Sequence, residues 1–203
     1  MLKFKVKLYK VYNWKYGYMD IKNKLENKNF ILKLLNNNDF DLLYNSGKNK
    51  KIWEQHPEND RWKREKFKIF FNNGIKNIFG LYGIFDKSNN TIIGSTRYYS
   101  YSKKNNSIKI GFTFLTPEYW GTGINLQIKT LMLGYAFNYV ENIYFDIGKN
   151  NIRSRKAIEK IGATLHLDAD TGNVLYILRF EDLKVINLGV IDEIKKNRSM
   201  EAS

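Results

Sequence analysis

The chain changes from a strand pattern to a helix pattern at Tyr119-Trp120-Gly121-Thr122-Gly123-Ile124-Asn125. Before this stretch, residues 107–115 alternate with a period of two, which predicts a strand with Ile110, Phe112 and Phe114 on one face. After it, apolar residues recur every three or four positions, as on one side of a helix. Two glycines allow a tight turn, and the free N–H groups at the helix start can hold an anion such as a pyrophosphate. A tight turn without a ligand is the alternative.

A second stretch follows a short apolar strand predicted over residues 143–147 and reads Asn150-Asn151-Ile152-Arg153-Ser154-Arg155-Lys156-Ala157-Ile158-Glu159-Lys160-Ile161-Gly162-Ala163. Its asparagines and its late glycine favour a helix over residues 151–161. Taken alone, the stretch also fits an amphipathic helix whose asparagine only caps the helix start.

Hydrophobic patterns and turn signals predict the other elements. Strands are expected over residues 30–35, 77–86, 91–101, 107–115, 164–167 and 174–180, and helices over residues 39–46 and 61–71 and from residue 124 onward. The strands from residue 77 to residue 115 form an antiparallel meander in this prediction. Residues 19–182 are expected to be one domain, residues 1–18 an N-terminal extension and residues 183–203 a tail with a short helix near residues 191–196.

Composition limits the possible functions. The chain has 203 residues, 43% of them hydrophobic, which is ample for a packed core. It has no cysteine, which excludes disulfide scaffolds, iron–sulfur clusters, cysteine-ligated zinc and a thiol nucleophile. With two histidines, a multi-histidine metal site is not expected either, and no metal is predicted. No apolar run is long enough for a membrane span, so we expect a cytoplasmic protein without membrane partners.

The net charge of +14 arises from 34 basic and 20 acidic residues. Such a charge attracts polyanions, including nucleic acid and phosphorylated cofactors. The lysines are spread along the chain, however, and lysine-, asparagine- and isoleucine-rich composition is also what an AT-rich genome produces. Charge alone therefore does not identify a partner.

Together, and in this order, the two stretches resemble the GNAT superfamily of N-acetyltransferases, in its ribosomal-protein N-acetyltransferase-like (RimJ/RimL-like) branch. The resemblance covers roughly residues 28–180, and residues 51–57, 92–98 and 110–115 also fit this branch. It implies an α+β fold with a mixed, mostly antiparallel central sheet of about six or seven strands flanked by about four helices. Acetyl-CoA is expected in the splay between two parallel strands, here residues 107–115 and 143–147.

The resemblance also assigns cofactor contacts. The phosphate loop corresponds to Trp120, Gly121, Thr122, Gly123, Ile124 and Asn125. Trp120 replaces the usual basic or amide residue and Asn125 replaces a small residue, while the central glycine is kept. Backbone groups of Phe114, Leu115 and Thr116 are expected to pair with the pantetheine arm, and Asn151 to contact it.

The implied reaction is direct transfer of an acetyl group from a thioester to an amine. Many relatives protonate the leaving thiolate with a tyrosine, and Ile158 stands at that position here. In the ribosomal-protein-like branch, a serine three residues after the asparagine does so, which indicates Ser154 as the acid. A small packing residue is the alternative for Ser154.

The base that deprotonates the amine is less defined. The related pattern has a glutamate where this chain has Lys109, and a lysine is protonated at neutral pH unless burial strongly lowers its pKa. His56 is our first candidate because of its ordinary pKa, with Glu54 and Glu118 as others. His56 also fits a structural turn before Pro57, and a water chain can replace a base.

Two functional hypotheses follow. The first is an N-acetyltransferase that acts on a small-molecule amine or a protein N-terminal α-amine; the basic charge suits an anionic cofactor and an acidic acceptor, and the chain is compatible with a homodimer. The second is an inactive module of the same fold that binds acetyl-CoA or nucleic acid. The aromatic residues Trp53, Trp62, Tyr98 and Tyr99 are expected in the core and on the sheet rather than in an acceptor cage.

Overall fold

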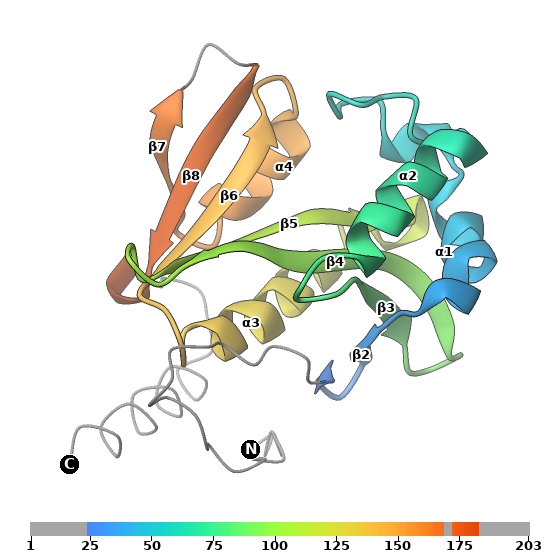
Figure 1. Cartoon of the computed structure of the whole chain (residues 1–203), viewed down its shortest axis with the longest axis horizontal. Helices are drawn as coiled ribbons and strands as arrows, with labels where there is room; N and C mark the ends of the chain where they lie inside the picture. The colour runs from blue at the N-terminus through green and yellow to red at the C-terminus, as the bar shows by residue number, and fades with distance from the viewer. Residues whose placement is uncertain (1–23, 169–171, 183–203) are drawn as a thin grey trace.

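One sheet of eight strands forms the framework of the described part of the chain, residues 24–168 and 172–182, in a computed structural model (Figure 1). The strands are β1 (Leu25–Glu26), β2 (Phe30–Leu34), β3 (Tyr82–Asp86), β4 (Thr91–Ser102), β5 (Ser107–Leu115), β6 (Asn142–Gly148), β7 (Thr164–Asp168) and β8 (Asn173–Arg179). They lie in the order β1-β2-β3-β4-β5-β6-β8-β7, and each neighbouring pair is antiparallel except β5 and β6. The expectations for residues 1–18, 183–203 and 191–196 concern residues outside the described ranges.

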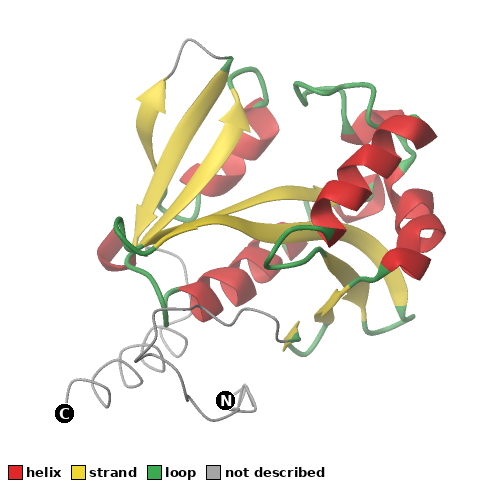
Figure 2. Cartoon of the chain, in the orientation of Figure 1, coloured by secondary structure: helices red, strands yellow, loops and turns green. Residues whose placement is uncertain are grey.

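Four α-helices flank the sheet within the same described ranges. They are α1 (Phe40–Gly47), α2 (Arg64–Ile75), α3 (Ile124–Ala136) and α4 (Ile152–Glu159), and short 3₁₀ turns occupy Asn37–Asp39, Lys50–Ile52, Pro117–Tyr119 and Phe180–Asp182. Helices α1 and α2 cover one face of the sheet, and α3 and α4 cover the other (Figure 2). Of the helices in residues 24–168 and 172–182, none is both long and apolar enough to cross a membrane.

Each face of the sheet has its own hydrophobic core. The core under α1 and α2 is largely aromatic and includes Leu43, Trp53, Phe67, Phe70 and Phe114. The core under α3 and α4 is larger, and its members include Leu32, Tyr98, Ile110, Met132 and Ile158. These two cores confirm the predicted mixed fold, with β1 as one strand more than the sequence pattern indicated.

The expected alternation along β5 is wrong at its second half. Ile110 packs in the α3 core, whereas Phe114 packs in the α1–α2 core on the opposite face. The cause is a β-bulge: Phe112 has a φ of 52°, and the register with β4 shifts between Ser95 and Arg97. One extra residue reverses which face each later side chain points to, which places Phe114 in the α1–α2 core. Phe112 itself, at the bulge, is 39% exposed.

Helix α2 ends later than the sequence predicted. The expected stop at Asn72-Asn73-Gly74 lies inside the helix, which continues to Ile75. Gly74 packs against Leu81, where an added Cβ would lie 3.0 Å from the leucine side chain. Close packing on the next segment thus outweighs the helix-breaking tendency of glycine, and β3 begins only at Tyr82.

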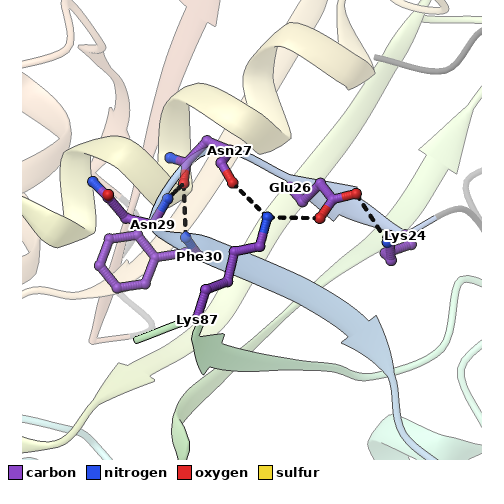
Figure 3. Close-up of polar contacts among 6 residues, drawn as sticks. All are labelled: Lys24, Glu26, Asn27, Asn29, Phe30 and Lys87. Atoms are coloured by element: carbon purple, nitrogen blue, oxygen red, sulfur yellow. Dashed lines mark hydrogen bonds and ion pairs between the residues drawn. The ribbon is translucent and has the colours of Figure 1, made fainter. Parts of the chain in front are cut away.

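The hairpin of β1 and β2 supports the start of α3. Figure 3 shows Lys87 donating to a Glu26 carboxylate oxygen at 2.8 Å and to the Asn27 carbonyl at 2.9 Å. The Asn27 side chain in turn accepts the N–H groups of Asn29 and Phe30, which fixes the turn. The amides of Asn27 and Asn29 also donate to Gln127 in the first turns of α3.

Strands β5 and β6 diverge soon after they meet (Figure 1). Their parallel pairing covers Ser107↔Asn142, Ile108↔Ile143 and Lys109↔Tyr144. Beyond it, β5 pairs with β4 as far as Leu115, while β6 pairs with β8 as far as Gly148. The two glycine- and asparagine-containing stretches follow these strand ends directly, so the fold brings both of them to the open end of one gap.

Candidate active site

The loop between β5 and α3 exposes its glycine backbone directly before the start of α3. Gly121 and Gly123 have φ values of 76° and 81°, a conformation that favours glycine, and helix α3 begins directly after Gly123. Among the described residues, nothing lies within 4 Å of a Cβ built on either glycine. Since Gly123 has no side chain to cap the helix, the first N–H groups of α3 and the positive end of its dipole are available to an anion.

Two aromatic side chains hold this loop in place. The Tyr119 hydroxyl donates to the Asp86 carboxylate at 3.0 Å, and the Trp120 indole N–H donates to the Leu115 carbonyl at 2.9 Å. The Thr122 hydroxyl closes the turn by donating to the Tyr119 carbonyl at 2.7 Å. The loop is therefore fixed to β3 and β5 by side chains, while its glycine backbone stays exposed.

The end of β5 offers one backbone donor to the gap. The N–H of Thr116 donates to the Ile93 carbonyl at 2.8 Å, and the Phe114 carbonyl faces Gly94, so both residues point their backbone groups at β4. By strand alternation, the N–H and C=O of Leu115 point the other way, toward the gap. Trp120 already occupies that carbonyl, so of the three expected residues Leu115 faces the gap through its N–H.

The start of α4 lies across the gap from this loop. The Asn151 side chain accepts the N–H of Ser154 at 3.1 Å and so caps the helix, as its sequence position predicted. Ser154 is half-buried, and its hydroxyl has no hydrogen-bond partner among residues 24–168 and 172–182. The Arg153 guanidinium stacks over the Trp120 ring, 3.9 Å from its centroid, which joins the two loops.

The segment before α2 also reaches this end of the gap. The Gln55 side chain accepts the N–H of Arg153 at 3.1 Å, and Pro57 packs so closely on Gly148 that an added Cβ would lie 2.7 Å away. A cavity of about 350 Å³ separates the two segments. Its walls include Glu54, His56, Asn59, Lys149 and Asn150.

His56 is a poor match to the expected base. Its Nδ1 accepts the Glu58 N–H at 2.9 Å, and its Nε2 lies 3.2 Å from the Arg61 guanidinium. Burial and the Arg61 charge lower the pKa of His56 to about 4. A group with this pKa takes up a proton weakly at neutral pH, so the geometry favours the structural interpretation of His56.

Three other residues named in the sequence analysis have structural roles. Lys109 donates to Asp146 at 2.8 Å, at the last paired position of β5 and β6, which ties the two strands where they part. Trp53 donates to the Gly47 carbonyl and Tyr98 to the Met132 carbonyl, and both side chains are buried in the two cores. These aromatic residues are core residues, as the sequence indicated.

Lys129 is a buried amine that the sequence analysis missed. It lies on α3 with an exposed fraction of 5%, donates to the Thr113 hydroxyl at 2.8 Å and is 5.8 Å from the Phe145 ring centroid. Thr113 is on β5 and Phe145 on β6, so this amine lies beneath the point where the strands diverge. Burial lowers the pKa of Lys129 to about 7. Its position between the buried Ile128 and Met132 was the signal in the sequence.

Arg97 is a second buried cation that the sequence analysis missed. It lies in the middle of β4 with an exposed fraction of 4%, and its Nε has no hydrogen-bond partner in the described part of the chain. The signal in the sequence was an arginine within an otherwise apolar central strand. A buried arginine is rare unless its charge is paired or binds a ligand.

Comparison with known proteins places this geometry in a family. A family model described as an acetyltransferase (GNAT) domain matches residues 29–164. No curated protein sequence matches the chain. Three solved structures illustrate the shared fold. A GCN5-related N-acetyltransferase from Brucella melitensis is 14% identical with a TM-score of 0.70, and the match covers 86% of this chain and 85% of that one.

The other two come from Vibrio cholerae. A protein assigned as a ribosomal-protein-serine acetyltransferase is 13% identical with a TM-score of 0.61, over 79% of this chain and 99% of that one. A spermidine N-acetyltransferase, solved in complex with CoA and spermine, is 16% identical with a TM-score of 0.56, over 77% of this chain and 98% of that one. At these identities the structures establish the fold alone. The family match, however, spans more than half of the chain and includes the diverging strands and both loops, so the chain belongs to the GNAT family of acetyltransferases.

Proposed function

We propose that the protein transfers an acetyl group from acetyl-CoA to a primary amine. The observation that carries this proposal is the divergence of β5 and β6 directly beside the uncapped start of α3. A gap between strands with unpaired backbone groups, next to a helix N-terminus, suits an extended ligand that ends in phosphates. The structural neighbour solved with CoA and spermine supports both the cofactor and an amine acceptor.

In this proposal, the N–H groups of the Gly121–Asn125 loop hold the pyrophosphate. The positive φ values of Gly121 and Gly123 and the open space beside both glycines fit this task, because a side chain there would occupy the place of a phosphate. Trp120 supplies no charge, but it positions Arg153 over its ring and so brings a cation to the same loop.

The Leu115 N–H and Asn151 then bind the pantetheine arm from the two sides of the gap. Acetyl-CoA supplies the thioester, and the amine nitrogen bonds to the acetyl carbon as the carbon–sulfur bond breaks. In this proposal the hydroxyl of the half-buried Ser154 passes a proton to the departing thiolate and regains one from water. Because the Asn151 side chain holds the N–H of Ser154, it also fixes the orientation of the first turn of α4.

The amine proton leaves through the cavity of about 350 Å³ at the end of β6. This cavity lies at the end of β6, which borders the gap, and Glu54 contributes a carboxylate to its wall. We therefore assign deprotonation of the amine to water in this cavity, with the Glu54 carboxylate rather than His56 as the group that accepts the proton.

The branch is proposed from a structural neighbour, and the net charge of this family member favours one class of acceptor. One structural neighbour is assigned as a ribosomal-protein-serine acetyltransferase, which supports the ribosomal-protein-like branch. A net charge of +14 slows encounter with basic ribosomal proteins, since like charges repel. We infer that the acceptor is a small amine or an acidic peptide.

The test is a turnover assay with a thiol-reactive dye. The chain has no cysteine, so the dye reports released CoA without background from the protein. Acetyl-CoA is supplied with a panel of small amines and peptides, and mass spectrometry of the product identifies an added acetyl group. Amine-dependent CoA release with an acetylated product supports the proposal; tight acetyl-CoA binding without turnover on any amine supports the inactive module instead.

A further inference from the structure

A second cavity, an open surface depression of about 360 Å³, lies between the C-terminal end of α2 and the strands β4 and β5. It is on the α1–α2 face of the sheet. Its walls are formed by Asn73, Lys76, Asn77, Arg97, Tyr99 and Phe112. Two of these side chains are basic and none is acidic, so the cavity is positively charged.

Arg97 is the unusual member of this wall. Its exposed fraction is 4%, its Nε is buried without a hydrogen-bond partner, and its guanidinium forms no ion pair with any residue that the structure describes. Its contacts are aromatic: the guanidinium lies 3.5 Å from the Phe112 ring centroid and 5.2 Å from that of Phe70. A buried charge is normally paired, because leaving water is costly for an ion.

A neighbouring arginine makes the missing partner more evident. Arg61 is equally buried, contacts the same Phe70 ring at 4.8 Å, and is paired with Glu58 at 2.7 Å. Burial and the adjacent Arg61 charge lower the pKa of Arg97 to about 10, so Arg97 stays charged at neutral pH. Both arginines have a buried Nε without a partner, but Arg61 is paired with a carboxylate through its other nitrogen atoms, whereas Arg97 has no carboxylate partner among the described residues.

The cavity and the gap between β5 and β6 share strand β5. Phe112 lines the cavity with its side chain, while its backbone lies in the bulged part of β5 that has already parted from β6. A small molecule anchored at Arg97 can therefore extend along β5 into the gap.

We propose that Arg97 binds the oxyanion of the acceptor, a carboxylate or a phosphate on a small amine, and so selects anionic amines as substrates. This inference rests on the proposed acetyl transfer and adds the acceptor class to it. A guanidinium offers parallel N–H donors that match either oxyanion, and Lys76 adds a second positive charge at the cavity wall.

The experiment compares amines that differ in one anionic group: L-leucine with L-leucinamide, and phosphoethanolamine with ethanolamine, in phosphate-free buffer. Thermal unfolding measures binding and CoA release measures turnover, for the wild type and for Arg97→Met, Arg97→Lys and Arg64→Met. Arg64 is the matched control, since it also stacks on an aromatic ring, 4.9 Å from the Phe40 centroid, but is paired with Asp41 outside the cavity.

We expect an anionic amine to be preferred over its neutral partner by about tenfold or more in kcat/KM, as a charge-assisted hydrogen bond to a buried group provides. Arg97→Met should remove the preference, Arg97→Lys should keep part of it, and Arg64→Met should keep all of it. A preference for L-leucine over L-leucinamide indicates that Arg97 binds a carboxylate, and a preference for phosphoethanolamine over ethanolamine indicates that it binds a phosphate. Acetyl-CoA affinity should be unchanged in Arg97→Met.

Equal binding and turnover of the anionic and neutral amines by the wild type would overturn the inference, as would a preference that survives in Arg97→Met. The comparison of anionic with neutral amines in the wild type tests the inference even if Arg97→Met does not fold. A failure of acetyl-CoA to bind would instead overturn the proposed function, and the unfolding shift caused by the anionic amines would still test the cavity.

Discussion

The Arg153 guanidinium lies 3.9 Å from the centroid of the Trp120 ring. Trp120 is in the loop that follows β5, and Arg153 is in the first turn of α4, which follows β6. The contact therefore joins the two sides of the gap at its open end. Trp120 stands where relatives carry a basic or amide residue, and its partner returns a positive charge to the same place.

The first prediction concerns that charge. Arg153→Gln should weaken acetyl-CoA binding by about three- to tenfold, because a cation beside the phosphate loop is lost. The loss should shrink as salt is raised, since screening weakens the same interaction in the wild type. Calorimetric titration at low and high salt measures it. Arg155→Gln is the control, because Arg155 is on the same helix but donates to Tyr176 on β8; an equal loss in both variants would contradict a specific role of Arg153.

The second prediction separates backbone strain from blocking of the phosphate loop. Gly123→Ala should reduce the free energy of unfolding by about 1–2 kcal/mol, because φ is 81° there. It should weaken acetyl-CoA binding less than Gly123→Glu does, since its methyl group takes up space beside the phosphates but adds no negative charge. Gly123→Glu should reduce acetyl-CoA affinity by at least about a hundredfold, since its carboxylate repels the phosphates. Denaturant unfolding and titration measure the two effects. If the glutamate variant binds as tightly as the alanine variant, the phosphates are not held at this loop.

The third prediction concerns the Ser154 hydroxyl. Ser154→Ala should lower kcat by about a hundredfold, the range expected for loss of one proton donor, with the acetyl-CoA dissociation constant within about twofold of the wild type. Ser154→Thr keeps a hydroxyl and should recover part of the rate. An alanine variant with normal kcat on a validated acceptor would assign Ser154 to packing.

The fourth prediction uses the buried amine of Lys129. Its folded pKa, about 7, is below that of an unfolded lysine, so the unfolded chain binds more protons between about pH 7 and pH 10. The free energy of unfolding should therefore rise with pH across this window through Lys129. Lys129→Met should be more stable than the wild type by roughly 3 kcal/mol near pH 7, and the difference should decrease toward pH 10. Chemical denaturation at several pH values measures it; a difference that does not change with pH would contradict the assignment.

The sequence predicted the fold through patterns that local chemistry determines. The strands β4 and β5, the helical spacing after Ile124 and the asparagine cap of α4 all appear in the structure near their predicted positions. Each of these depends on residues close together in the chain. The two loops also fall at one end of the gap because their strands are neighbours in the sheet.

The features that the sequence did not predict depend on contacts between segments that are distant in the chain. The bulge at Phe112 needs a positive φ at an aromatic residue, which no local pattern signals. Arg97 and Lys129 are buried because elements far along the chain pack over them, whereas a residue-by-residue interpretation places charges at the surface. The stacking of Arg153 on Trp120 likewise joins two segments that the sequence analysis treated as separate motifs.

Thermal unfolding with and without saturating acetyl-CoA shows whether the gap between β5 and β6 binds this cofactor. At 100 times the Kd, a ligand adds about 2.7 kcal/mol to the free energy of unfolding, or roughly 5–10 °C in Tm for a chain of this size. We expect that rise in the wild type, a much smaller rise with adenine nucleotides alone, and none in Gly123→Glu. No rise in the wild type, or an equal rise in Gly123→Glu, would contradict the account.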